Sequence, residues 1–198
     1  GESRPTPAIV IDGVGSDWAG AGSAAEDPKE DGKGDADIKA VRYVGDTAKR
    51  VLYVRVDYWQ DFRYETRAYR DPFAASVTLD FDSQRDGKAL YRANLFFASG
   101  LVGFFQTTGG TFVGLPAPGV RAAYGTEAGT GFVEAAIPWD LIGGQPALDV
   151  SIGTASPSGN DWLNTSPIHV GMGHVSGDGA SFVIRADWRY RVSSPWRD

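Results

Sequence analysis

The feature that most constrains the fold is a period-two alternation of apolar and polar residues. In residues 51–59 apolar side chains occupy every second position, and the same pattern returns at 38–44, 76–82, 91–97, 132–139, 148–152 and 182–188. Successive side chains of a β-strand point to opposite faces, so these segments predict strands with one buried face. Turn signals separate them at 44–46, 85–87, 108–110 and 158–160, and the one helical candidate is a short turn at 138–143.

Many short strands with glycine- and proline-rich connections predict an all-β chain, folded as an antiparallel β-sandwich or jelly roll. At 198 residues the chain fits a single domain, and its hydrophobic content of 42% can fill a substantial core. We expect residues 1–8 to form an N-terminal linker and residues 9–198 to form the sandwich.

Net charge and composition limit the classes of partner that this chain can have. The net charge of −6 argues against a nucleic-acid partner and against docking on an anionic membrane. No apolar run reaches the roughly 20 residues of a membrane-spanning helix, so no membrane insertion is expected. Cysteine is absent, which excludes disulfides and thiolate metal sites. The polar opening with Pro5 and Pro7 favours a linker or processed end, and we expect a secreted or cell-surface module, appended to a catalytic or surface domain.

An acidic loop precedes the first predicted strand. Residues 26–37 hold six carboxylates and two glycines. Carboxylates this crowded repel one another, and oxygen-only ligand sets suit Ca²⁺, which accepts six to eight oxygens in loose geometry. Acidic, glycine-rich loops are also commonly just solvated, so on the loop alone both interpretations remain open.

The order of several motifs resembles a known family. An Ile-Asp-Gly turn followed by Asp-Trp lies in residues 9–20, paired strands follow at 37–44 and 52–56, a strand ending in acidic residues lies at 76–82, and a late strand runs into a Pro-Trp turn at 133–143. In this order the motifs cover most of the chain and resemble the carbohydrate-binding module family 9-like, DOMON-related β-sandwich domains.

The resemblance implies structural roles for two tryptophans and a cation for the acidic loop. Trp18 and Trp139 are expected to be core or hinge residues. The family commonly holds calcium in acidic loops near a sheet edge, which here implies structural Ca²⁺ on the four aspartates Asp27, Asp31, Asp35 and Asp37. A second acidic stretch at 80–87 begins like an EF-hand loop but lacks the closing Glu, so we interpret it as a hairpin turn first.

The resemblance also implies a carbohydrate or polysaccharide partner, held by aromatic rings that clamp a sugar and by polar side chains that bond its hydroxyls. The candidate rings are Trp59, Phe73 and Trp162, and the candidate polar partners are Asp57, Arg92 and Asn94. Trp188 and Trp196 are further aromatics. For each ring the alternative is packing over a sheet edge. The sequence thus favours a non-catalytic carbohydrate-binding module.

Other functions have weaker signals. No nucleophile elbow, His-Glu-x-x-His or phosphate-binding loop is present, and a carboxylate pair drawn from Asp57, Asp80 or Glu134 is unspecific. Some members of the fold group are haem b-binding electron-transfer domains, for which Met172 with His169 or His174 is the only ligand set in the sequence. A purely structural or adhesion module is the third alternative.

Overall fold

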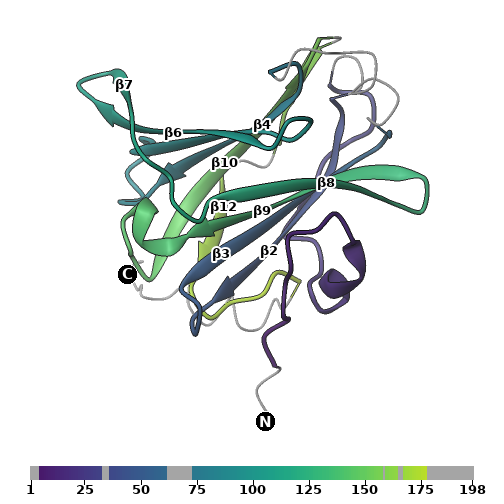
Figure 1. The fold of residues 1–198 in the computed structure, drawn as a ribbon, viewed down its shortest axis with the longest axis horizontal. Coiled ribbons are helices and arrows are strands. Elements are labelled where there is room, and N and C mark those ends of the chain that lie inside the picture. The colour runs from purple at the N-terminus through teal and green to yellow at the C-terminus, as the bar shows by residue number, and fades with distance from the viewer. Residues whose placement is uncertain (1–4, 33–35, 62–72, 158, 165–166, 178–198) are drawn as a thin grey trace.

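The computed structural model describes residues 5–32, 36–61, 73–157, 159–164 and 167–177, and it forms two antiparallel sheets packed face to face (Figure 1). The five-stranded sheet has the order β1-β2-β3-β9-β8. Its strands are β1 (Ala25–Glu26), β2 (Ile38–Asp46), β3 (Val51–Tyr58), β9 (Thr130–Pro138) and β8 (Arg121–Glu127). The predicted all-β antiparallel β-sandwich is confirmed.

The second sheet is seven-stranded and has the order β11-β10-β4-β5-β6-β7, with β12 pairing another part of β10. Its strands are β11 (Gly159–Trp162), β10 (Ala147–Ser156), β4 (Ser76–Asp82), β5 (Tyr91–Phe96), β6 (Leu101–Thr108), β7 (Thr111–Gly114) and β12 (Ile168–Gly171). Two short 3-10 helices, η1 (Gly15–Gly20) and η2 (Trp139–Ile142), complete the described elements. The helical candidate at 138–143 corresponds to η2, whereas the sequence pattern did not predict η1.

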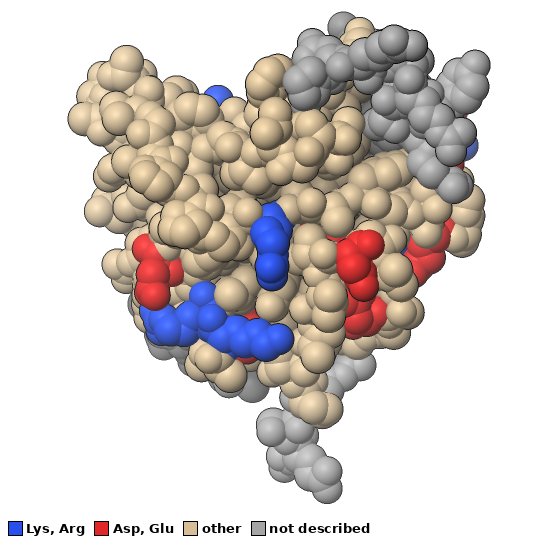
Figure 2. All heavy atoms as spheres, viewed as in Figure 1, with Lys and Arg blue, Asp and Glu red and all other residues tan. Residues whose placement is uncertain are grey.

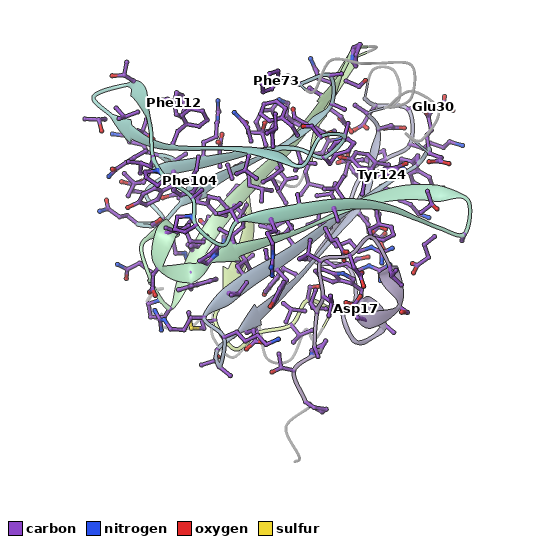
Figure 3. All side chains as sticks on the ribbon, viewed as in Figure 1. Asp17, Glu30, Phe73, Phe104, Phe112 and Tyr124 are labelled. Atoms are coloured by element: carbon purple, nitrogen blue, oxygen red, sulfur yellow. The ribbon has the colours of Figure 1, made fainter. Side chains whose placement is uncertain are left out.

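The core lies between the two sheets. Val54, Leu79 and Ile152 are at most 1% exposed, and each belongs to the apolar face of an alternating strand. Phe104 of β6 also points into the space between the sheets (Figure 3). The alternation therefore predicted correctly which face of these strands points into the core. It did not predict that β3 and β9 are buried on their outward faces as well, where Arg55 and Glu134 are at most 1% exposed.

One predicted turn is wrong. Residues 44–46 lie inside β2, and the chain turns only at residues 47–50. Gly45 serves a close approach instead, because a Cβ there would lie 2.2 Å from the carbonyl oxygen of Gly171. The predicted turns at 85–87 and 108–110 are confirmed, with positive φ at Gly87, Gly109 and Gly110.

The outward face of the five-stranded sheet is covered by the N-terminal segment. Ile9, Trp18 and Ala21 pack against Val44, Tyr53 and Ala136 of that face. The Glu134 carboxylate, fully buried, accepts hydrogen bonds from the backbone N–H of Asp12 (2.8 Å) and Gly13 (2.6 Å) and from the Trp18 indole (2.9 Å). Burial raises the pKa of Glu134. Trp18 and Trp139 are both buried, which confirms their predicted structural role.

Candidate cation and ligand-binding sites

Three carboxylates meet where the acidic loop approaches β11. Asp27 follows β1, Asp31 lies in the loop and Asp161 belongs to β11; one oxygen of each lies within 4.8 Å of the other two. We call Asp27, Asp31 and Asp161 the carboxylate cluster. Asp27 and Asp161 are buried, whereas Asp31 is exposed.

The hydrogen bonds of the cluster leave one buried oxygen without a partner among the described residues. Asp161 Oδ2 accepts from the backbone N–H of Ile38 (2.8 Å), and Asp27 Oδ1 accepts from that of Asn164 (2.7 Å). The Asn164 side-chain amide donates to Asp31 Oδ2 (2.5 Å). Asp27 Oδ2 is buried and has no hydrogen-bond partner among the described residues. A buried acceptor among like charges calls for a cation or a proton.

The electrostatics agree with that requirement. Burial, together with the charges of Asp31, Asp27 and Asp37, raises the pKa of Asp161 to about 6. Burial also raises the pKa of Asp27, and neighbouring Asp31 raises it further, while the Asn164 backbone N–H opposes the shift. These residues therefore fit Ca²⁺: the donor set is all oxygen, and an ion would satisfy Asp27 Oδ2 and relieve the repulsion.

The cluster contains two of the four aspartates predicted from the sequence and one that was missed. Asp37 is not part of it: its carboxylate accepts from the backbone N–H of Glu30 (2.7 Å) and Gly32 (3.4 Å), which closes the acidic loop. Asp35 lies outside the described residues. Asp161 was missed because it is 124 positions beyond Asp37 and no local pattern connects the two.

The cluster joins the edges of the two sheets. β1 is an edge strand of the five-stranded sheet and β11 an edge strand of the seven-stranded sheet. Asp161 pairs with Thr154, whose hydroxyl bonds Tyr58 in the core, so Asp161 is on the inward side of β11. The next residue, Trp162, consequently points outward.

A row of outward residues crosses the seven-stranded sheet from Trp162. In register across the strands, Trp162 pairs with Gly153, Gly153 with Thr78, Thr78 with Asn94 and Asn94 with Gly103. The Trp162 ring covers Gly153, where a Cβ would lie only 2.7 Å from the ring, and Trp162 is 47% exposed. Glycine at 153 thus lets the indole lie flat on the sheet.

Polar and aromatic groups continue the row. The Thr78 hydroxyl donates to Asn94 Oδ1 (3.0 Å), so the Asn94 amide NH₂ is the group left for a ligand. Phe73, 59% exposed, packs edge-on against Phe96 with ring centroids 5.0 Å apart. We call Phe73, Thr78, Asn94, Phe96 and Trp162 the aromatic platform.

Arg92 flanks the platform. Its Nε and one terminal nitrogen donate to the two carboxylate oxygens of Asp80 (2.6 and 2.9 Å), and its guanidinium carbon lies 4.5 Å from the ring centroid of Phe112. Phe73 and Phe112 lie on the side of the seven-stranded sheet away from its partner (Figure 3). In Figure 2 the charged side chains in view lie mostly over the half that holds β2, β3 and η1, while the half with β6 and β7 is largely uncharged.

The other two predicted ligand residues, Asp57 and Trp59, lie on the opposite sheet. Asp57 Oδ1 accepts two hydrogen bonds from the Arg55 guanidinium (3.0 and 2.7 Å). The Trp59 indole donates to the main-chain oxygen of Asp27 (3.3 Å). The six predicted residues therefore divide into four at or beside the aromatic platform and two on the far face.

The remaining candidates are engaged elsewhere. His169 Nδ1 bonds Asp149 (2.5 Å), the Met172 sulfur lies 4.0 Å from an Arg50 nitrogen, and His174 is buried beside Gly171. Of the carboxylates considered for hydrolysis, Asp57 is bound to Arg55, Asp80 to Arg92, and Glu134 to the N-terminal segment. Trp188, Trp196 and the predicted strand at 182–188 lie outside the described residues.

Comparisons with known proteins add no family. No protein-family model matches the chain, and no curated protein matches it significantly. In the part of the chain that the structure describes, no helix has both the length and the apolar character needed to cross a membrane.

Proposed function

We propose that this β-sandwich is a non-catalytic carbohydrate-binding module whose sugar site is the aromatic platform and whose sheet edges are held together by Ca²⁺. The observation that supports this most directly is the row from Trp162 to Asn94, which sets an exposed ring and an amide donor on one flat face.

The dimensions of the platform suit a saccharide. Neighbouring strands lie about 4.8 Å apart, so three strand steps separate Trp162 from Asn94 by roughly 14 Å at the backbone. The Trp162 ring lies over Gly153, so the gap between the indole and the Asn94 side chain is shorter than this backbone distance. A sugar lying on the outward face of the indole would stack its C–H face on that ring and extend over Thr78, so that its hydroxyls reach Asn94, with the Phe73–Phe96 pair at the end of the site.

The cation supports the platform through adjacent residues of β11. Asp161 points inward to the carboxylate cluster and Trp162 points outward to the platform, while Asn164 binds both Asp27 and Asp31. An ion on the cluster would fix the strand that carries the principal ring, so Ca²⁺ and sugar binding should be linked.

A glycan array run in CaCl₂ and again in EDTA tests the proposal, followed by calorimetry with the best binder. Trp162→Ala and Asn94→Ala should each weaken binding at least tenfold, which is about 1.4 kcal/mol. Val10→Ala is the control, because Val10 is also an exposed apolar residue but belongs to the N-terminal segment over the other sheet. If no glycan binds in either condition, the carbohydrate-binding proposal fails and a structural or adhesion module is the remaining alternative. Undiminished binding by Trp162→Ala would refute the assignment of the aromatic platform as the sugar site.

A further inference from the structure

A second hollow lies on the outward face of the five-stranded sheet, apart from the aromatic platform. This polar pocket has a volume of about 280 Å³. Its walls come from β2 (Lys39 and Arg42), from Asp57 of β3 and Trp59 just after it, from the end of β8 (Glu127) and from the acidic loop (Asp27). The N-terminal segment packs on another part of the same face.

Two arginines and two carboxylates form the floor of the pocket, and their charges cancel. Arg55 donates to Asp57 and also to Glu127 (2.8 Å), and its hydrogen bond lowers the pKa of Glu127. Arg42 Nε lies 3.6 Å from Asp57 Oδ2. Two guanidinium groups therefore alternate with two carboxylates. The whole lining carries four acidic and three basic side chains, so it attracts an ion of either sign only weakly and favours a neutral ligand that both donates and accepts hydrogen bonds.

The floor also holds unused hydrogen-bonding capacity. Arg42 Nε and Asp57 Oδ2 are buried without a hydrogen-bond partner among the described residues, because their 3.6 Å separation is too long for a bond. The Arg42 side chain is 27% exposed, so a modest rotation opens the gap. A ligand hydroxyl placed between the two groups would accept a hydrogen bond from Arg42 Nε and donate one to Asp57 Oδ2, which would satisfy both.

Trp59 supplies the apolar wall. Its indole edge is anchored to the main-chain oxygen of Asp27, and the Lys39 ammonium lies 5.0 Å from its ring centroid. One aromatic ring beside charged, planar hydrogen-bonding groups is the combination that recognises a sugar. We infer that the polar pocket binds a single neutral sugar residue, as a second saccharide site on the sheet opposite the aromatic platform.

The test follows the tryptophan indole N–H signals of the full ¹⁵N-labelled chain in CaCl₂, during titration with the methyl glycosides of glucose, galactose, mannose and xylose. Trp59→Phe and Trp162→Phe assign the two signals. We expect at least one glycoside to shift the Trp59 signal saturably at millimolar concentration. The midpoint should rise at least tenfold in Arg42→Met and stay unchanged in Trp162→Ala, with otherwise native spectra in both variants.

Three results would overturn the inference. The first is no shift of the Trp59 signal by any of the four glycosides up to about 50 mM, which is weaker than specific sites usually bind. The second is tighter binding of methyl glucuronide than of methyl glucoside, since that would mean an anion site. The third is loss of the Trp59 shift in Trp162→Ala. The Trp162 signal reports on the platform separately, so failure of either site is distinguishable from failure of the other.

Discussion

Replacing Asp161 by Asn should have opposite effects with and without calcium. The amide oxygen can still accept from the Ile38 N–H, so the change removes mainly one buried charge from the carboxylate cluster. Without Ca²⁺ the wild-type cluster repels itself, and the variant should be the more stable protein at pH 7.5. With Ca²⁺ the wild type gains a bound ion that the variant binds poorly, and the order should reverse.

The size of this stability difference follows from the raised pKa of Asp161. The pKa of Asp161 is raised to about 6 from the usual 3.8, which is worth roughly 3 kcal/mol at 1.36 kcal/mol per unit. Solvent at exposed Asp31 screens the cluster, so about 1–3 kcal/mol is the working range. A carboxylate with a raised folded pKa is destabilised when charged, so the contribution of Asp161 to the stability of the ion-free wild type is most favourable below about pH 4. This contribution is lost between about pH 4 and pH 6.

Calcium should offset that loss. At an ion concentration 100-fold above the dissociation constant, binding stabilises the fold by about 2.7 kcal/mol. For a chain of this length, that raises the melting temperature by roughly 5–11 °C. The gain should be smaller at pH 5, where protons compete with the ion for the cluster.

Thermal melts followed by circular dichroism, at pH 5 and 7.5 with EDTA or CaCl₂, measure both effects. Glu30→Gln is the matched control, because it removes one charge from the same loop but lies outside the cluster, and it should respond to Ca²⁺ like the wild type. The reasoning is refuted if Ca²⁺ leaves the wild-type melting temperature unchanged, or if it raises wild type and Asp161→Asn equally.

Two further predictions concern the outward faces of the sheets. Glu134→Ala leaves the indole of Trp18 and two backbone N–H groups without their acceptor, so we expect a loss of about 3 kcal/mol and a melting temperature roughly 6–12 °C lower. Glu134→Gln keeps one acceptor and should lose less, and equal losses would contradict the assigned bonds. Gly153→Val places side-chain atoms where the Trp162 ring lies, so near-ultraviolet circular dichroism should change and affinity for the platform sugar should fall at least tenfold. Unchanged spectra would mean that the ring does not rest on Gly153.

Local pattern was a good guide where apolar and charged residues alternate strictly along a strand. The strands at 76–82 and 91–97 were predicted almost to the residue, because alternation of apolar core residues with Asp80, Arg92 and Asn94 leaves a single orientation. β1, β7, β11 and β12 were missed, since strands of two to four residues are too short to show a period. β6 and β8 were also missed, although they are eight and seven residues long, because most of their residues are only half-buried and neither strand shows a clear alternation. The turn predicted at 44–46 failed because the glycine serves contact with Gly171, which no local signal reveals.

The sequence by itself determined that this chain is an all-β sandwich, which face of the alternating strands points into the core, and that the acidic loop is a candidate for a cation. The tertiary structure alone decided which carboxylates meet, because Asp161 reaches Asp27 and Asp31 only when the edges of two sheets come together. It also divided the aromatics, placing Trp162 and Phe73 beside one sheet and Trp59 on the other. The physical reason is that strand periodicity depends on residues close together in the sequence. A binding site, in contrast, is assembled from strands whose pairing and packing depend on the whole chain.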